Sequence, residues 1–202
     1  MNHSAAIPVP HGAPHAETAT GLDTWKLGFW TFIGSETLFF GSLISTYMVY
    51  KGRSVAGPYP HDVLNIPLTS VSTFVLLMSS LMMVLALAAV QRGDRRGTLT
   101  WLMATALFGA TFLGFQAFEF THFYGEGLTL SSNLFGSSFY VLTGFHGAHV
   151  TVGVIWLLAL WVQALRGRLG QADALTVEIA GLYWHFVDVV WIAIFTLVYL
   201  LE

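Results

Sequence analysis

Residues 181–195, GLYWHFVDVVWIAIF, form an apolar run suited to a membrane, yet the run contains two ionisable side chains. His185 and Asp188 are three positions apart, so in a helix they lie on one face. Ionisable groups inside a membrane normally face protein and find partners there, because a charge at the bilayer centre costs at least about 2.5 kcal/mol. The stretch therefore predicts a membrane helix that packs on other helices through polar contacts.

The composition of the whole chain agrees with a membrane location. Of 202 residues, 55% are hydrophobic and 9% are charged, whereas soluble domains carry about 25% charged residues. The formal net charge of -3 is too small to indicate a nucleic-acid partner. The sequence contains no cysteine, which excludes disulfides, thiolate metal sites and iron–sulfur clusters.

Five segments have the length of about 20 apolar residues that a helix needs to cross the hydrocarbon core. Polar breaks that contain Gly or Pro separate these segments and predict loops. We therefore expect an all-α, polytopic membrane protein, with residues 24–202 forming one bundle of five transmembrane helices. The predicted spans are 27–50, 66–90, 99–123, 136–165 and 177–201.

Residues 1–23 are rich in Ala, Pro, Thr and His, which predicts a flexible N-terminal arm. The arm contains His3, His11 and His15, and tracts of this kind sometimes bind metals. A solvated tail is the simpler interpretation, and we favour it.

The cationic residues predict the orientation. Lys51 and Arg53 lie on one side of the predicted spans, and six cationic residues lie on the other. Because cytoplasmic loops carry the excess of Lys and Arg, we expect a cytoplasmic N-terminus and a C-terminus on the periplasmic or extracellular side. The six residues are Lys26, Arg92, Arg95, Arg96, Arg166 and Arg168.

Four ionisable residues are predicted at nearly one depth. With a rise of 1.5 Å per residue, they lie between about 12 and about 16 Å from the cytoplasmic edge. We expect a buried polar layer in which Glu36 and His149 form the leading pair, together with His185 and Asp188. Depth alone supports two interpretations equally: a proton relay or ion path, and hydrogen bonds that hold the helices in register.

Two further carboxylates are less informative. Glu119 is predicted about 30 Å along the third span, at the outer interface, where it meets water or headgroups. Glu178 lies in the first turn of the fifth span, where an acid suits the helix dipole.

Residues 143–153, TGFHGAHVTVG, contain His146 and His149 at a spacing compatible with metal ligation. Two ligands are too few for a closed metal site, so we favour hydrogen bonding and packing. Gly144 and Ala148 form a small-xxx-small pair that predicts the close approach of another helix. We expect no metal, no haem and no catalytic residue in this chain.

Four stretches resemble subunit III of the haem–copper terminal oxidases, in its short form with five spans. They are FIGSETLFFGSL (32–43), FQAFEF (115–120), SSNLFGSSFYVLTGFHGAHVTVG (131–153) and YWHFVDVVWIAIFTLVYLLE (183–202). The resemblance covers residues 25–202. It maps the membrane-embedded acid of the family onto Glu36, its second glutamate onto Glu119 and the expected partner of the acid onto His149.

This resemblance implies a non-catalytic subunit of an oxygen-reducing, proton-pumping complex in the inner membrane of a bacterium. Enzymatic activity would belong to the complex, with haems and copper in subunit I. The chain would pack on subunit I, with subunit II and small subunits as further partners. It would also hold phospholipid in its cleft and sustain proton uptake.

The resemblance leaves the electron donor open. Two loop segments, AGPYPHD (56–62) and LTLSSNLFGSSFY (128–140), look closer to cytochrome c oxidases than to quinol oxidases. Subunit III of a quinol oxidase is the alternative, and a subunit that accompanies nitric oxide reductases is a weaker one. A stand-alone proton-coupled transporter is disfavoured because the sequence shows no internal repeat.

Overall fold

The computed structural model describes residues 24–54, 57 and 64–201, and these are almost entirely helical. The predicted arm at 1–23, with its three histidines, lies outside the described residues. The elements in chain order are α1 (Thr24–Tyr50), α3 (Ile66–Gln91), α4 (Arg95–Gly125), α5 (Leu134–Leu165), the short 3-10 helix η1 (Gln171–Asp173), α6 (Ala174–Ile194) and the π-helical turn η2 (Phe195–Leu200).

Five of these helical segments are long and apolar enough to cross a membrane, which confirms the predicted all-α, five-helix fold. The spans predicted from hydropathy began too late in α4 and α5, because the first turns of these two helices are polar or lie beside polar residues. Helix α4 begins at Arg95 because the Asp94 side chain accepts a hydrogen bond from the Gly97 N–H at 3.0 Å. Asn133 caps α5 in the same way, accepting from the Gly136 N–H at 2.7 Å.

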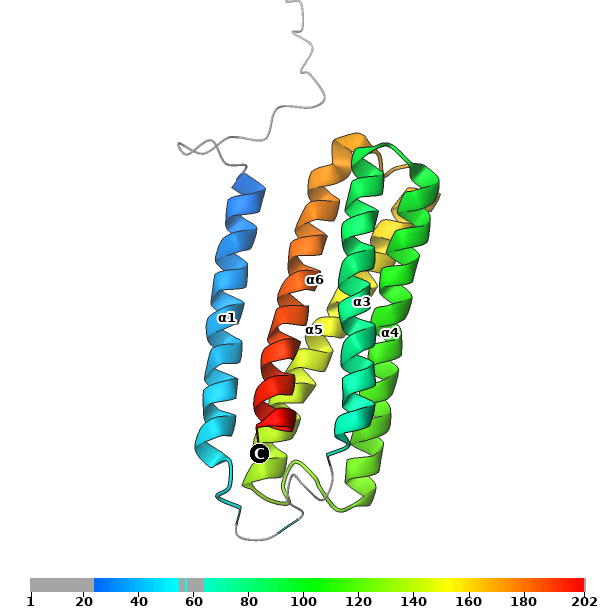
Figure 1. The fold of residues 1–202 in the computed structure, drawn as a ribbon. Helices are drawn as coiled ribbons and strands as arrows, with labels where there is room; N and C mark the ends of the chain where they lie inside the picture. The colour runs from blue at the N-terminus through cyan, green and yellow to red at the C-terminus, as the bar shows by residue number, and fades with distance from the viewer. Residues whose placement is uncertain (1–23, 55–56, 58–63, 202) are drawn as a thin grey trace, which may run out of the picture.

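Helices α3, α4, α5 and α6 form a four-helix body, and α1 stands beside α5 and α6 (Figure 1). The buried residues of α1 are Ile33, Phe40 and Tyr47, which are seven positions apart. Such a repeat places them on one narrow line along the helix. Most of the α1 surface is therefore left for lipid or for other chains.

Two tryptophans of α6 fill the centre of the four-helix body. The indole N–H of Trp184 donates to the Ser79 hydroxyl at 2.8 Å, and that of Trp191 donates to the Thr73 hydroxyl at 2.9 Å. Both rings are almost completely buried, and both hydroxyls belong to α3. The apolar rings thus supply buried area while their only polar atom finds a partner on the neighbouring helix.

Glycines make room for the Trp184 ring. A Cβ atom at Gly109 of α4 would lie 2.4 Å from Trp184 Cη2, and one at Gly153 of α5 would lie 2.8 Å from the same ring. Real side chains do not approach so closely. The absence of a side chain at these two positions is what lets α4 and α5 close around the indole.

The close approach predicted at Gly144 and Ala148 is not made by any helix of the described residues. A Cβ atom at Gly144 would meet nothing within 4 Å, and Ala148 is exposed. The adjacent face of α5 makes the close contact instead, because a Cβ atom at Gly147 would lie 2.6 Å from Gln116 Oε1. The small-residue spacing was real, but spacing alone does not say which face of a helix meets its neighbour.

Replacement of Gly109 by Ala is expected to destabilise the bundle by about 1–3 kcal/mol, because the added methyl group overpacks the site against Trp184. Thermal unfolding of the purified protein in detergent measures the effect. Gly114→Ala on the same helix is the matched control, since its Cβ would meet nothing within 4 Å. Equal midpoints for the two variants would contradict the proposed role of Gly109.

Candidate functional site

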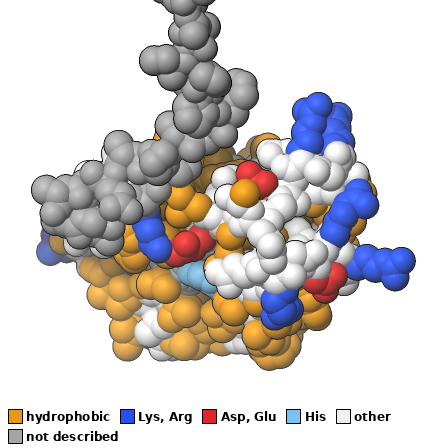
Figure 2. Space-filling view, turned by 90° about the horizontal axis from the view of Figure 1, so that it is seen from above, with side chains coloured by type: hydrophobic (Ala, Val, Ile, Leu, Met, Phe, Trp, Pro, Cys, Tyr) orange, Lys and Arg blue, Asp and Glu red, His pale blue; other side chains and the backbone are white. Residues whose placement is uncertain are grey.

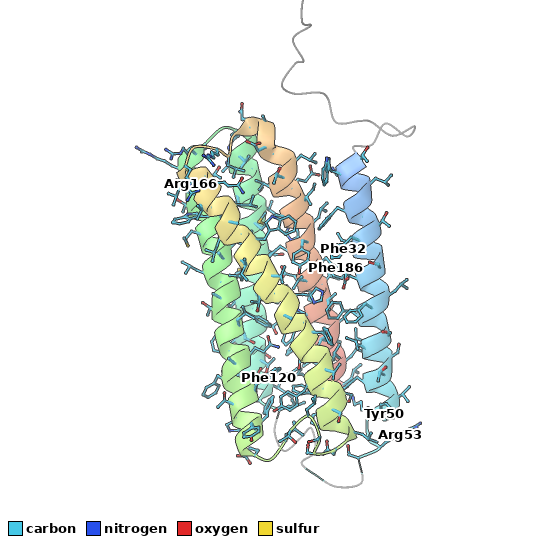
Figure 3. All side chains as sticks on the ribbon, turned by 180° about the vertical axis from the view of Figure 1, so that it is seen from behind. Phe32, Tyr50, Arg53, Phe120, Arg166 and Phe186 are labelled. Atoms are coloured by element: carbon cyan, nitrogen blue, oxygen red, sulfur yellow. The ribbon has the colours of Figure 1, made fainter. Side chains whose placement is uncertain are left out.

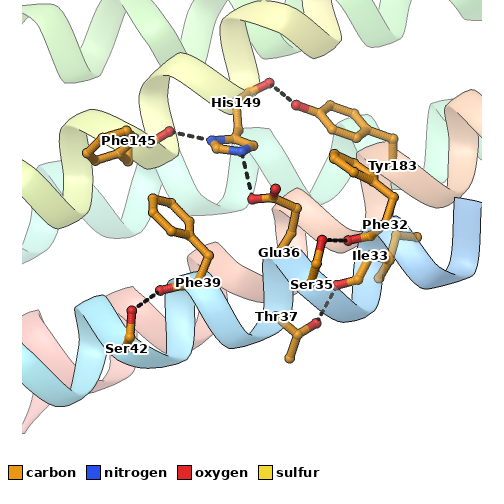
Figure 4. A network of polar contacts seen from close by, with 10 residues as sticks. All are labelled: Phe32, Ile33, Ser35, Glu36, Thr37, Phe39, Ser42, Phe145, His149 and Tyr183. Carbon is orange, nitrogen blue, oxygen red and sulfur yellow. Dashed lines mark hydrogen bonds and ion pairs between the residues drawn. The ribbon is translucent and has the colours of Figure 1, made fainter.

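The Glu36 and His149 side chains meet between α1 and α5. Nε2 of His149 lies 3.2 Å from Oε2 of Glu36, and the two side chains are 20% and 21% exposed, respectively. Nδ1 of the same imidazole lies 2.7 Å from the Phe145 carbonyl oxygen, one turn earlier in α5 (Figure 4). Both ring nitrogens therefore have partners.

These contacts restrict where protons can be. A backbone carbonyl only accepts, so Nδ1 of His149 carries a proton and donates it to Phe145. The contact between Nε2 and Oε2 then needs one further proton, held either by the imidazole or by the carboxyl group. The pair is thus an ion pair or a neutral acid–base pair, and one proton moving about an ångström interconverts them.

Neighbouring groups hold the imidazole in place. The Tyr183 hydroxyl of α6 donates to the His149 carbonyl at 3.0 Å. The Phe40 ring packs edge-on against the imidazole, with centroids 5.0 Å apart. Three helices, α1, α5 and α6, therefore meet at this one pair.

The pair lies in the wall of an open, mainly apolar groove of about 570 Å³ between α1 and α5. A second groove of about 420 Å³ lies toward the start of α1 and shares Phe29 and Phe32 with the first. Apolar grooves of this size suit acyl chains. The main groove is lined by Phe29, Phe32, Glu36, Phe145, Ala148, His149, Val152, Trp156 and Tyr183.

Polar contacts also tie both ends of α1 to the body. The Lys26 ammonium pairs with Glu178 of α6, and the Lys51 ammonium donates to the Leu201 carbonyl. Sequence reasoning assigned Glu178 only to the helix dipole and missed both contacts, because no local pattern links residues about 150 positions apart. Helix α1 is consequently held at three heights, with Glu36 in the middle.

His185 and Asp188 share a partner on α3. The Ser80 hydroxyl oxygen lies 2.7 Å from Nδ1 of His185 and also hydrogen-bonds Oδ2 of Asp188. Among the described residues no direct bond joins this trio to Glu36 or His149, so the single layer expected from depth consists of two clusters. Ser80 was missed because a serine within an apolar run gives no signal of its own.

His146 and His149 have different partners. His146 is completely buried, its Nε2–H donates to the Val187 carbonyl of α6 at 3.2 Å, and its ring stacks 4.8 Å from that of Trp191. The two histidines therefore serve different interfaces. Within the described ranges, no group of three or more His, Cys, Asp and Glu side chains has the arrangement of a metal site.

The predicted contact of Glu119 with water or headgroups is wrong. Its side chain is 4% exposed and accepts a hydrogen bond from the Thr69 hydroxyl of α3. The rise per residue gave its height along α4 but not its direction around the helix axis. Glu119 faces α3, so it is a contact within the bundle.

The chain is similar to known proteins along almost its whole length. The family model described as cytochrome c oxidase subunit III matches residues 11–202. Quinol oxidase subunit 3 of Bacillus subtilis is 39% identical over 95% of each chain. Cytochrome c oxidase subunit 3 of Bacillus sp. strain PS3 is 40% identical over 87% of this chain and 84% of the relative, and that of Alkalihalophilus pseudofirmus is 38% identical over 98% of each.

A double-mutant cycle tests the energetic link between Glu36 and His149. Because each side chain is the other's partner, Glu36→Gln and His149→Gln together should cost less than the sum of the single changes, with a coupling of about 0.5–3 kcal/mol. Unfolding in mixed micelles of increasing SDS content gives the free energies. The control cycle combines His149→Gln with Glu119→Gln, which has a different partner, and should be additive. Additivity in both cycles would show that the pair contributes nothing.

Proposed function

The chain belongs to the cytochrome c oxidase subunit III family, and on this basis we propose that it is the non-catalytic subunit III of a proton-pumping haem–copper terminal oxidase. The complex would reduce oxygen to water in subunit I, which would hold the haems and copper. The chain itself is a multi-pass membrane protein with five membrane-spanning helices.

The Glu36–His149 pair is the observation that best supports a role in proton handling and stabilisation. The pair lies within the span of α1, holds one proton between two side chains and borders a groove open to the outside. A group so placed can exchange a proton without holding a redox centre. It also ties α1, which has little buried surface, to the rest of the bundle.

The apolar groove and the exposed face of α1 favour lipid and protein partners. We propose that phospholipid occupies the groove beside Glu36, and that the chain packs directly on subunit I, with subunit II and small subunits as further neighbours. Aromatic side chains line most of the groove, and its polar groups already bind one another or the backbone. Acyl chains fit such a surface better than a polar ligand does.

We propose the orientation and location from the charges. Most Lys and Arg residues near the helix ends lie at one end of the bundle, which Figure 2 shows from above. Arg166 lies at that end, and Arg53 lies at the opposite one (Figure 3). By the positive-inside rule the N-terminal end of α1 faces the cytoplasm, in the inner membrane of a bacterium.

Purification of the complex through this chain tests the proposal. We expect large haem-containing subunits to accompany it, and removal of the chain to leave the haem spectrum intact while shortening the working life of the enzyme. Optical spectra and oxygen consumption over repeated turnover measure both effects. Isolation without any haem protein, or loss of haem when the chain is stripped away, would contradict this function.

Glu36→Gln separates this function from that of a stand-alone transporter. The variant should retain most oxygen reduction at early times, because the chemistry takes place in another subunit. Glu126→Gln, an exposed carboxylate just after α4, is the control. Proton flux in liposomes that contain this chain alone, abolished by Glu36→Gln, would instead establish a transporter.

We propose cytochrome c as the electron donor, with quinol as the alternative. Relatives named for either donor are 38–40% identical to this chain. The purified complex should oxidise reduced cytochrome c at least ten times faster than a short-chain quinol. The reverse preference would assign the chain to a quinol oxidase.

A further inference from the structure

A second ionisable cluster, formed by Ser80, His185 and Asp188, lies apart from the site described above. Ser80 is on α3, while His185 and Asp188 are on α6, so the cluster bridges two helices of the four-helix body. Asp188 is 3% exposed, and its Oδ1 atom has no hydrogen-bond partner among the described residues. His185 is partly exposed.

We propose that these three side chains form a proton-binding site, in which one exchangeable proton rests on Asp188 and reaches His185 through the Ser80 hydroxyl. The site is distinct from the Glu36–His149 pair. It does not depend on which electron donor the complex uses.

Proton counting allows two arrangements of hydrogen bonds in the cluster. The Ser80 hydroxyl has one proton and contacts two groups, so it donates to one and accepts from the other. In the first arrangement the Asp188 carboxyl O–H donates to Ser80, and Ser80 donates to Nδ1 of a neutral His185. In the second, Nδ1–H of His185 donates to Ser80, and Ser80 donates to the Asp188 carboxylate.

One concerted step connects the two arrangements. The Asp188 O–H bond breaks as its proton passes to the Ser80 oxygen, while the proton already on Ser80 passes to Nδ1 of His185. The products are a carboxylate and an imidazolium, so charge and protons balance. Because His185 is partly exposed whereas Asp188 is buried, exchange with groups outside the cluster takes place through the imidazole ring.

Burial places the resting proton on Asp188. An ionised carboxylate there would keep the charge-bearing Oδ1 atom buried without a donor, which is costly. No Asp, Glu, His, Lys or Arg occurs in α3, so that helix offers no cation. The acidic, basic and histidine residues on the other elements packed against α6 are Glu36 and Lys26 of α1, His146 and His149 of α5, and Asp173 of η1. The tyrosines on these elements are Tyr47 and Tyr50 of α1, Tyr140 of α5 and Tyr199 of η2. Glu36, Lys26, His146 and His149 have partners of their own.

Infrared spectroscopy of the purified complex tests the proposal, with the spectrum of each variant subtracted from that of the unmodified complex. Only a protonated carboxyl group absorbs in the carboxylic C=O stretching region. We expect Asp188→Asn to remove one band from that region. We also expect the band to shift in D₂O, since its proton is exchangeable. Ser80→Ala should keep the band but move it to higher frequency, because the carboxyl group loses its hydrogen-bond acceptor.

Ser70→Ala is the matched control. Ser70 lies on the same helix, is exposed, and its hydroxyl donates to the Ile66 carbonyl one turn earlier in α3. It should leave the spectrum unchanged. If Asp188→Asn does not assemble, the Ser80→Ala shift decides alone. A spectrum in which neither variant alters a carboxylic band would show that Asp188 is ionised, and the proposal would be wrong.

The same sample keeps this proposal separate from the proposed function. Absence of haem absorption would contradict the assignment to an oxidase but would leave the carboxyl band to be measured. Normal haem absorption without an Asp188 band would contradict only the proton site.

Discussion

An ionisable side chain within a membrane span is stabilised by a partner inside the protein, because hydrocarbon offers none. This constraint explains why Glu36 meets His149 and why His185 and Asp188 meet one serine. The indole N–H groups of Trp184 and Trp191 follow the same rule through α3 hydroxyls. Each contact joins residues of different helices, so satisfying the polar atoms also sets the register in which the helices pack.

Helix α1 depends most on such contacts. Its buried apolar residues form one line of three, whereas the core helices bury residues on broader faces. Three polar contacts, at Lys26, Glu36 and Lys51, hold it along its length. Between them the apolar groove remains open beside α5. The same arrangement holds the helix to the body and leaves an apolar groove open beside it, as the proposed lipid and protein partners require.

The arrangement of protons gives the polar contacts a second possible role besides structural support. In both clusters an imidazole and a carboxyl group share one proton, directly in the first and through a hydroxyl in the second. A purely structural contact needs only the hydrogen bonds. A contact that tolerates two proton positions can also respond to the charge of its surroundings. In the proposed oxidase subunit, structural support and proton exchange are compatible roles of the same side chains.

The sequence by itself determined the class of fold. Hydropathy measures the free energy of moving each residue from water into hydrocarbon, and this free energy depends mainly on the type of residue. The five spans follow from local composition, and the shared height of Glu36 and His149 follows from the rise of a helix. Direction around each helix axis was decided only by the tertiary structure. Glu119 turns inward to Thr69, Gly147 rather than Gly144 meets a neighbouring helix, and Ser80 joins His185 to Asp188. In a membrane both sides of a helix are apolar, so hydrophobicity does not mark the buried face, and only the packing of specific side chains selects it.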